Sequence, residues 1–216
     1  MAHVPVAERR RQFVRATTKV VTEHGVSGAT TRRIAEEAGA PLASLHYCFS
    51  GKDELMEAVY DYVVGDFIGA VRSATADCVG VADAVGAACR AAWARMGEDP
   101  EEQVATWELV LHWLRLPGEA GKSGAAYEAY AAAMTEILTA AAERAGEGPL
   151  PEAETLARLV IAGMEGITLQ YVVGCDRKRA DVLVNTLVRA VGLLRADPPP
   201  SSPGATSSPP LPGSPP

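Results

Sequence analysis

Thr30–Phe49, with the sequence TTRRIAEEAGAPLASLHYCF, is the stretch that decides the fold of this chain. Thr30 is suited to cap a first helix, because its hydroxyl can accept a hydrogen bond from the free N–H groups of the first turn. Gly39 tolerates the positive φ at which many helices end, and Pro41 has the fixed φ of a helix start. The sequence therefore predicts two short helices joined by a tight turn, which is a helix-turn-helix.

The second helix of this pair has few apolar positions with which to anchor itself. Leu45 and Phe49 lie four residues apart and hold it to its own domain. The remaining positions are left for a molecule outside the domain, and in helix-turn-helix proteins this helix enters the major groove of DNA. We therefore expect a regulator that binds a double-stranded DNA operator.

Residues of both helices and of their flanks are the candidates for contacts with DNA. Arg9, Arg10 and Lys52 are expected to meet phosphates, which position a protein on DNA without reading its sequence. An arginine of the first helix can pair with guanine, and small apolar side chains of the second can meet a thymine methyl. For each residue the alternative is an ordinary solvated helix face. The candidates are Arg9, Thr31, Arg32, Arg33, Leu42, Ala43, Ser44, His46, Tyr47 and Lys52.

From about Arg9 to Val59 the chain resembles the N-terminal domain of the tetracycline-repressor (TetR) family. The matching runs are TEHG, ATTRRIAEEAG and APLASLHYCFSGKDELMEAV, which follow the family pattern without a gap. Pro41 stands where the family often has a capping Ser, and His46 stands where it usually has Tyr. The resemblance implies a three-helix DNA-binding domain and a helical ligand-binding and dimerisation domain, with about nine helices in all. It also implies a repressor that a small molecule releases from a palindromic operator.

The net charge of −7 conceals an asymmetry between the two parts of the chain. Residues 1–52 hold eight Lys or Arg and four Asp or Glu, a net charge of +4. Residues 53–216 hold twelve against twenty-three, a net charge of −11. The basic end is the end with the helix-turn-helix, as DNA binding requires. The acidic remainder opposes non-specific binding to DNA.

Helical periodicity recurs along the chain and strand alternation does not, which predicts an all-α fold. A chain of 216 residues with 48% apolar content can bury a full core. We expect the helix-turn-helix domain over residues 1–52 and an effector-binding and dimerisation domain over residues 53–196. Residues 197–216 hold nine of the fifteen prolines and are expected to be a disordered tail.

Caps and helix breakers set the expected ends of the helices. Ser50 and Asp53 form a capping-box-like opening to a long helix that links the two domains. Asp99 followed by Pro100 opens a later helix. The clearest expected spans are Val6–His24, Gly51–Asp77, Asp99–Leu116, Glu152–Gly174 and Arg179–Arg195, with a loop over Gly118–Gly124.

Cysteine usage and the lack of a targeting segment favour a reduced, soluble, cytoplasmic protein with no membrane partner. Cys48, Cys78, Cys89 and Cys175 are widely spaced and form no C-x-x-C motif. There is no basic-then-apolar leader and no run of eighteen apolar residues. Each cysteine is interpreted first as a small buried hydrophobe. For Cys48 the alternative is a thiol whose oxidation weakens operator binding.

The middle helices gather aromatic and methionine side chains, which are typical of small-molecule cavities. For each of them the alternative is plain core. The candidates for effector binding are Trp93, Met96, Trp107, His112, Trp113, Tyr127, Tyr130 and Met134. Glu108, His112 and Arg115 lie on one side of an apolar helix, either as polar groups of this pocket or as a solvated ion stripe. No second ligand stands near His112 at metal-binding spacing, so we expect no metal and no cofactor.

One helix-turn-helix reads few base pairs, so we expect a homodimer. The last two helices carry apolar stripes that can form a four-helix interface about a two-fold axis. The alternative is that these stripes pack only inside the protomer. The interface candidates are Leu156, Leu159, Val160, Met164, Ile167, Tyr171, Leu183, Leu187, Val191 and Leu194.

Two other classes of protein compete with a ligand-controlled repressor. An enzyme is not indicated, because the chain has no G-x-S-x-G, no H-E-x-x-H and no phosphate-binding glycine loop. The closer alternative is a DNA-binding regulator whose core is filled and that takes no small-molecule effector.

Overall fold

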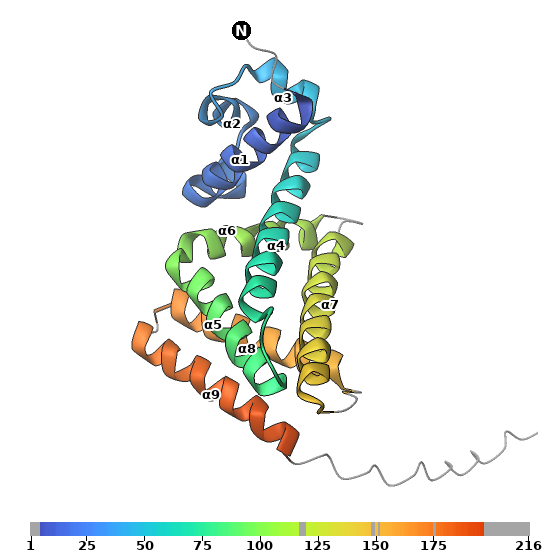
Figure 1. The fold of residues 1–216 in the computed structure, drawn as a ribbon. Helices are drawn as coiled ribbons and strands as arrows, with labels where there is room; N and C mark the ends of the chain where they lie inside the picture. Colours follow the sequence, from blue (N-terminus) through green and yellow to red (C-terminus); the bar gives the residue numbers. More distant parts are fainter. Residues whose placement is uncertain (1–4, 117–119, 148–149, 151, 175, 197–216) are drawn as a thin grey trace, which may run out of the picture.

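A computed structural model describes residues 5–116, 120–147, 150, 152–174 and 176–196. Within these residues the chain forms nine α-helices and no strand, as the periodicity predicts (Figure 1). The helices are α1 (Val6–Gly28), α2 (Thr31–Glu37), α3 (Leu42–Cys48), α4 (Lys52–Thr75), α5 (Val81–Glu98), α6 (Pro100–Arg115), α7 (Ala120–Ala145), α8 (Ala153–Val172) and α9 (Arg177–Ala196). The expected tail and Cys175 lie outside the described residues.

Local chemistry explains the ends of α1, α2 and α3. Gly25 breaks the helical path of α1 with a φ of 69°, in the left-handed region that glycine tolerates best. The Thr30 hydroxyl accepts from the backbone N–H of Arg33 and caps α2. Gly39 turns the chain after α2 with a φ of 57°, and α3 begins directly after Pro41. Thr30, Gly39 and Pro41 therefore act as the sequence predicts.

The upper part of the molecule in Figure 1 is built around one apolar cluster, here called the head core. Phe13, Ile34 and Leu45 contribute to it from α1, α2 and α3, and all three are fully buried. The cluster continues past residue 52 into α4, α6 and α7. Its members there are Leu55, Met56, Val59, Tyr60, Val64, Ala105, Leu109, Trp113 and Ala126. The head core therefore joins the helix-turn-helix to three helices of the larger unit.

A second apolar cluster, the body core, holds α5, α7, α8 and α9 together at the lower end of the molecule. Gly163 of α8 permits a close helix–helix approach, because a Cβ on it would meet Leu187 of α9 at 2.7 Å. The long helix α4 runs between the two ends of the molecule (Figure 1). Helix α6 crosses beneath α1 and packs against it.

Two local predictions differ from the structure. The start of α4 is closed by Ser50 with Glu54 rather than with Asp53, since both the N–H and the hydroxyl of Ser50 donate to Glu54 at 2.8 Å. The loop expected over Gly118–Gly124 is helical from Ala120, the first residue of α7. Ser123 is buried there and donates its hydroxyl to the carbonyl of Val110, and Ala126 packs in the head core. Tertiary contacts of this kind override the weak helix propensity of the glycines.

Candidate nucleic-acid interface and internal cavity

Helix α3 divides cleanly into a packed side and an open side. Leu45 and Cys48 are buried in the head core, whereas Ala43 and His46 are exposed. Tyr47 is 79% exposed, which is unusual for a tyrosine and leaves the whole ring for an outside partner. Leu42 is also exposed and Ser44 is half-buried. The candidates on this helix therefore share a surface that the protomer does not cover.

The basic candidates around α3 are mostly held by their own protein. Arg33 is exposed and donates to the carbonyl of Gly28 at 2.7 Å. Arg9 donates to Gln12 at 2.6 Å. Arg32 is exposed and Thr31, at the start of α2, is half-buried. These positions are compatible with phosphate contacts, because surface hydrogen bonds of this kind exchange readily for a charged partner.

Arg10 was expected to contact phosphate, and the structure gives it a different role. Its guanidinium donates to the carbonyl of Cys48 and to Glu54, with 2.9 Å between Nη2 and the carboxylate. It also lies 4.1 Å from the centre of the Phe49 ring, a cation–π contact. Hydrogen bonds from Ser50, and then from Arg10, lower the pKa of Glu54 to about 2. Arg10 thus joins α1, the end of α3 and the start of α4.

The break in α1 is where the head meets the rest of the molecule. The N–H of Val26 donates to Glu108 of α6 at 2.9 Å, and its carbonyl accepts from Lys52 of α4 at 2.8 Å. We call this arrangement the Val26 junction. The Glu108 carboxylate packs so closely against Gly25 that a Cβ there would lie 2.8 Å from Oε2. Glu108 is therefore neither a pocket group nor part of a simple solvated stripe, the two expected roles.

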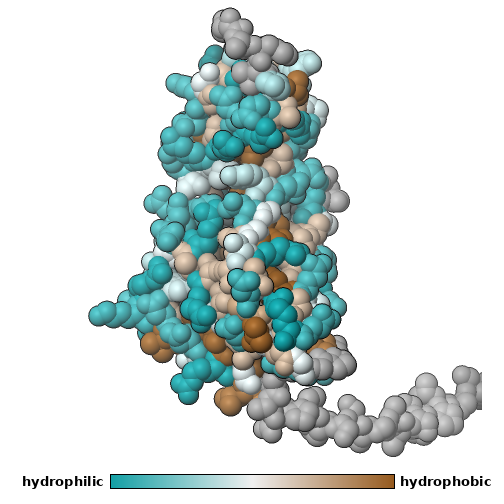
Figure 2. Space-filling view, viewed as in Figure 1, coloured by the Kyte–Doolittle hydropathy of each residue, from teal (hydrophilic) through white to brown (hydrophobic). Residues whose placement is uncertain are grey.

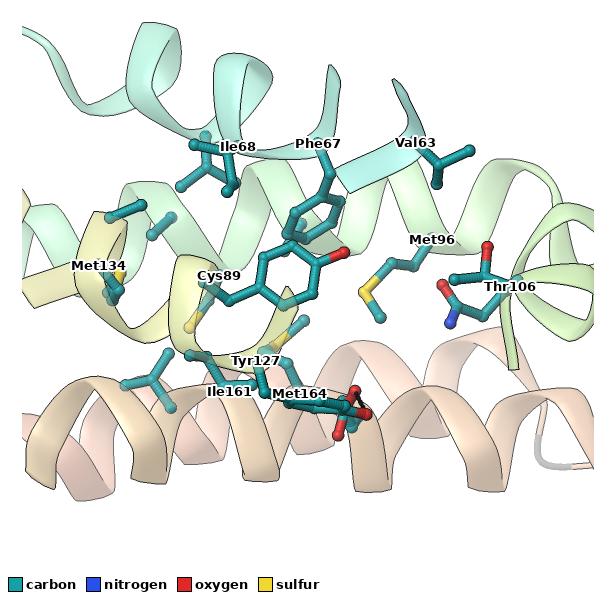
Figure 3. Close-up of a pocket in the computed structure, with 18 of the residues that line it drawn as sticks. Val63, Phe67, Ile68, Cys89, Met96, Thr106, Tyr127, Met134, Ile161 and Met164 are labelled. Atoms are coloured by element: carbon teal, nitrogen blue, oxygen red, sulfur yellow. Dashed lines mark hydrogen bonds between the residues drawn. The ribbon is translucent and has the colours of Figure 1, made fainter. Parts of the chain in front are cut away.

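A cavity of about 120 Å³ lies between the head core and the body core. Figure 3 shows Val63, Phe67 and Ile68 of α4 on one side of it and Ile161 and Met164 of α8 on the other. Its wall comes from α4, α5, α6, α7 and α8, and is almost entirely apolar. The lining residues are Tyr60, Val63, Phe67, Ile68, Val71, Ala88, Cys89, Ala92, Met96, Gln103, Thr106, Trp107, Val110, Tyr127, Tyr130, Ala133, Met134, Ile137, Val160, Ile161, Met164 and Glu165.

Several of the effector candidates lie in this wall, namely Met96, Trp107, Tyr127, Tyr130 and Met134. Trp93 lies elsewhere, because its indole N–H donates to Asp181 of α9 at 2.6 Å and its ring packs under Arg177. Trp113 is 1% exposed and packs edge-on against Tyr60 in the head core. His112 follows Glu108 by one turn of α6 and is not part of the cavity wall either. These residues point in different directions because of how each helix is oriented about its own axis. Composition alone does not reveal that orientation.

Glu165 is the charged residue of the cavity wall that sequence reasoning missed. It is half-buried on α8, and its Oε1 accepts from the Tyr127 hydroxyl at 2.7 Å. Burial raises the pKa of Glu165, and the hydrogen bond from Tyr127 offsets part of that rise. Burial also raises the pKa of Tyr127 and of Tyr130, and that of Tyr60 to about 12. A signal was present, since Glu165 is the one charged residue between Leu159 and Gly174.

The expected dimer stripes on α8 and α9 mostly face the body core of the protomer. Leu156, Val160, Met164, Ile167 and Val191 are buried there, and Tyr171, Leu183 and Leu187 pack against them. Leu159 remains exposed, and the side chain of Leu194 is not described. Other apolar residues of these two helices lie outside, and Figure 2 shows apolar patches over the lower part of the molecule. The exposed residues are Leu169, Val173 directly after α8, Val182 and Leu193.

The cysteines and the acidic residues give no sign of further chemistry in the described part of the chain. Cys48, Cys78 and Cys89 are buried free thiols, and burial raises the pKa of Cys89 to about 11. Across the described ranges, no group of three or more His, Cys, Asp or Glu could hold a metal ion. None of the helices in this described part is long and apolar enough to cross a membrane.

Comparison with known sequences places this architecture among regulators. Residues 13–59 match the family described as bacterial regulatory proteins, tetR family. The chain is 33% identical over 190 residues to the HTH-type nicotine-responsive transcriptional repressor HdnoR of Paenarthrobacter nicotinovorans, covering 87% of this chain and 95% of the relative. It is 47% identical over 49 residues to the HTH-type transcriptional regulator PksA of Bacillus subtilis, covering 23% of this chain and 24% of that protein.

Solved structures share the whole fold. A TetR transcription regulator from Haloarcula marismortui superposes with a TM-score of 0.73 at 19% identity, covering 87% of this chain and 98% of its own. The multidrug binding protein EbrR, in its complex with ethidium, gives a TM-score of 0.63 at 27% identity over 87% of this chain and 99% of that chain. The fold of the two relatives extends over both the head core and the body core of the present chain.

Proposed function

The chain belongs to the TetR family of transcriptional regulators, and on that basis we propose that it is a repressor that a small apolar or aromatic molecule releases from a palindromic operator. The molecule binds in the cavity between the two cores. The operator is read by α3 and the start of α2, through the exposed side chains described above.

One observation carries the proposal of a switch. Trp107 lines the cavity, and the next residue of α6, Glu108, holds the N–H of Val26 in the head. A molecule that shifts the backbone of α6 at Trp107 therefore also moves Glu108, the group that fixes the break in α1. Helices are stiff, so a small displacement at the cavity is passed along α6 to the Val26 junction rather than absorbed.

The relatives support control by a small molecule. One is a repressor described as nicotine-responsive, and one solved structure of similar fold is a complex with ethidium. A difference of about 1–3 kcal/mol in the affinity of a ligand for two arrangements is enough for a useful switch. The two arrangements differ here in the orientation of the head relative to α4 and α6.

Reading a palindrome requires a second copy of the chain, so we propose a two-fold homodimer through α8 and α9. Two recognition helices must then lie roughly 34–36 Å apart, one turn of DNA. The exposed apolar residues of α8 and α9, among them Leu159, Leu169 and Val182, supply a surface for the partner. Movement of the two heads about their Val26 junctions changes the separation of the helices.

The test starts from the DNA that co-purifies with the protein, which is sequenced to find the operator. A compound library is then screened for an increase in melting temperature, because a ligand that binds the folded state alone stabilises it. Each hit is titrated into the protein–operator complex, and operator affinity is measured by fluorescence anisotropy. We expect at least one hit to weaken operator binding by about fivefold or more. If stabilising compounds leave operator affinity unchanged, the chain is a DNA-binding regulator without effector control.

A further inference from the structure

The cavity wall contains a carboxylate with no basic partner. Among the described residues that line it, Glu165 is the one charged side chain, and no Lys, Arg or His lies among them. Its single hydrogen bond in the described structure comes from the Tyr127 hydroxyl, to Oε1. A half-buried carboxylate without a counter-charge is unfavourable for folding, as the raised pKa of Glu165 reflects. A glutamine or a leucine would fill the same place at lower cost.

Aromatic rings surround the same space. Phe67 and Tyr130 meet edge to face with 5.5 Å between ring centres, and Tyr127 lies 6.2 Å from Tyr130 in the same manner. Tyr60 and Trp107 complete the aromatic part of the wall. Ring faces attract positive charge and repel negative charge. Both the carboxylate and the rings therefore favour a cation and disfavour an anion.

We propose that the ligand of this cavity is a small organic cation, a protonated amine or a quaternary ammonium carried on an aromatic or apolar body. The inference rests on the ligand-controlled function proposed above and names its chemical class. The positive group lies against Glu165 and the rings of Tyr127 and Tyr130. The apolar body lies among the side chains of Phe67, Met96 and Met134. Tyr127 is a positioning residue that holds the carboxylate toward the cation.

The size of the cavity limits the body of this ligand. At about 120 Å³ it is similar to engineered apolar cavities of about 150 Å³ that hold one benzene molecule. The cavity as it stands therefore limits the apolar body to about one aromatic ring. Met96, Met134 and Met164 line the cavity, and flexible thioether chains of this kind can rearrange around a larger body.

The test uses two compounds of the same shape that differ in charge. Phenyltrimethylammonium carries a permanent positive charge, and tert-butylbenzene is its uncharged isostere. Binding of each to the full-length protein is measured by calorimetry and by tryptophan fluorescence, since Trp107 lies in the wall. The variants are Glu165→Gln, which keeps the shape and removes the charge, and Tyr127→Phe, which keeps the charge and removes the hydroxyl. Glu154→Gln is the matched control, because Glu154 is an exposed carboxylate on the same helix and outside the cavity.

We expect the parent protein to bind the cation more tightly than the isostere. Glu165→Gln should reduce the affinity for the cation by about tenfold or more and change the affinity for the isostere by less than about twofold. Tyr127→Phe should weaken binding of the cation by about threefold and leave binding of the isostere unchanged, because the hydroxyl that positions Glu165 is lost. Glu154→Gln should bind both compounds as the parent does. Melting curves establish that Glu165→Gln is folded, which is expected because a neutral amide is less costly to bury than a carboxylate.

Different results overturn different claims. If the isostere binds and the cation does not, the cavity is a ligand site and the assignment of a cation is wrong. If Glu165→Gln reduces the affinity for both compounds equally, Glu165 shapes the cavity and does not select for a positive charge. If neither compound binds the parent at millimolar concentration, both the cation and the proposed ligand-controlled function fail for this cavity.

Discussion

Replacing Glu108 with Ala isolates the link between the cavity and the head. The substitution removes the acceptor of the Val26 N–H, 2.9 Å away, without touching the cavity wall or the exposed side of α3. Hydrogen bonds to charged groups contribute about 1.5–3 kcal/mol when buried. Glu108 is exposed, so solvent screening reduces the expected contribution to about 1 kcal/mol. The variant should therefore melt about 2–4 °C below the parent.

The effect on the switch should be larger than the effect on the fold. If the Val26 junction transmits ligand binding, losing about 1 kcal/mol of coupling makes the ligand about fivefold less effective at releasing DNA. Operator affinity is measured by anisotropy with and without saturating ligand, and the ratio of the two is compared between proteins. Glu101→Ala is the control, since Glu101 is an exposed acid on the same helix and its carboxylate makes no hydrogen bond among the described residues.

Two results would contradict this reasoning. A Glu108→Ala protein that releases operator over the same range as the parent would exclude the Val26 junction as the route. Equal losses in Glu108→Ala and Glu101→Ala would assign the effect to the charge of α6 rather than to the hydrogen bond.

Three further predictions concern the DNA surface, the dimer and the charge in the cavity. Tyr47→Ala should reduce operator affinity by about tenfold or more in a gel-shift assay and leave the melting temperature unchanged, because the ring is 79% exposed. Light scattering should give twice 22.6 kDa for the parent, whereas Val182→Glu on α9, at a position 63% exposed, should give a monomer that still melts cooperatively. Affinity for phenyltrimethylammonium should fall as the pH is lowered from neutral, because the raised pKa of Glu165 means that its carboxylate is protonated earlier than an ordinary glutamate as the pH falls. A flat profile would contradict the assignment, and Glu165→Gln should give one. The other titratable groups of the cavity wall are Tyr60, Cys89, Tyr127 and Tyr130. Their raised pKa values keep them neutral as the pH is lowered from neutral.

The unliganded protein should respond to pH in the opposite sense at this group. A carboxyl whose pKa is raised on folding contributes stability below its unfolded pKa, and that contribution is lost as the pH rises through the folded value. Glu165→Gln should therefore be at least as stable as the parent at neutral pH. Stability and cation affinity then change in opposite directions, which separates a binding role for Glu165 from a structural one.

Sequence reasoning succeeded where the controlling interactions are local. The cap at Thr30, the turn at Gly39 and the Asp99 cap of α6 depend on neighbours within three or four residues, and all three are present in the structure. The same holds for most helix limits. The helix-turn-helix was therefore predicted almost to the residue.

The candidate cavity was predicted less well, because it depends on how helices rotate against one another. Trp107 and Trp113 lie on the same helix six residues apart, yet one lines the cavity and the other fills the head core. Amino-acid composition made both tryptophans equally good candidates for the cavity wall. Arg10 and Glu108 look like surface charges in the sequence, and only their long-range partners Glu54 and Val26 reveal that they join helices.

The continuity of the head core across residue 52 limits how this protein can be recombined. A chimera cut at that point would give a foreign head the α4 side chains Leu55 and Val59 and the α6 side chains Leu109 and Trp113, all shaped for Phe13 and its neighbours. A transplanted DNA-binding domain would keep its operator specificity but lose the complementary apolar surface that α4 and α6 provide. A reading head of new specificity is therefore expected to require matching changes in α4 and α6, or else substitutions confined to the exposed side of α3.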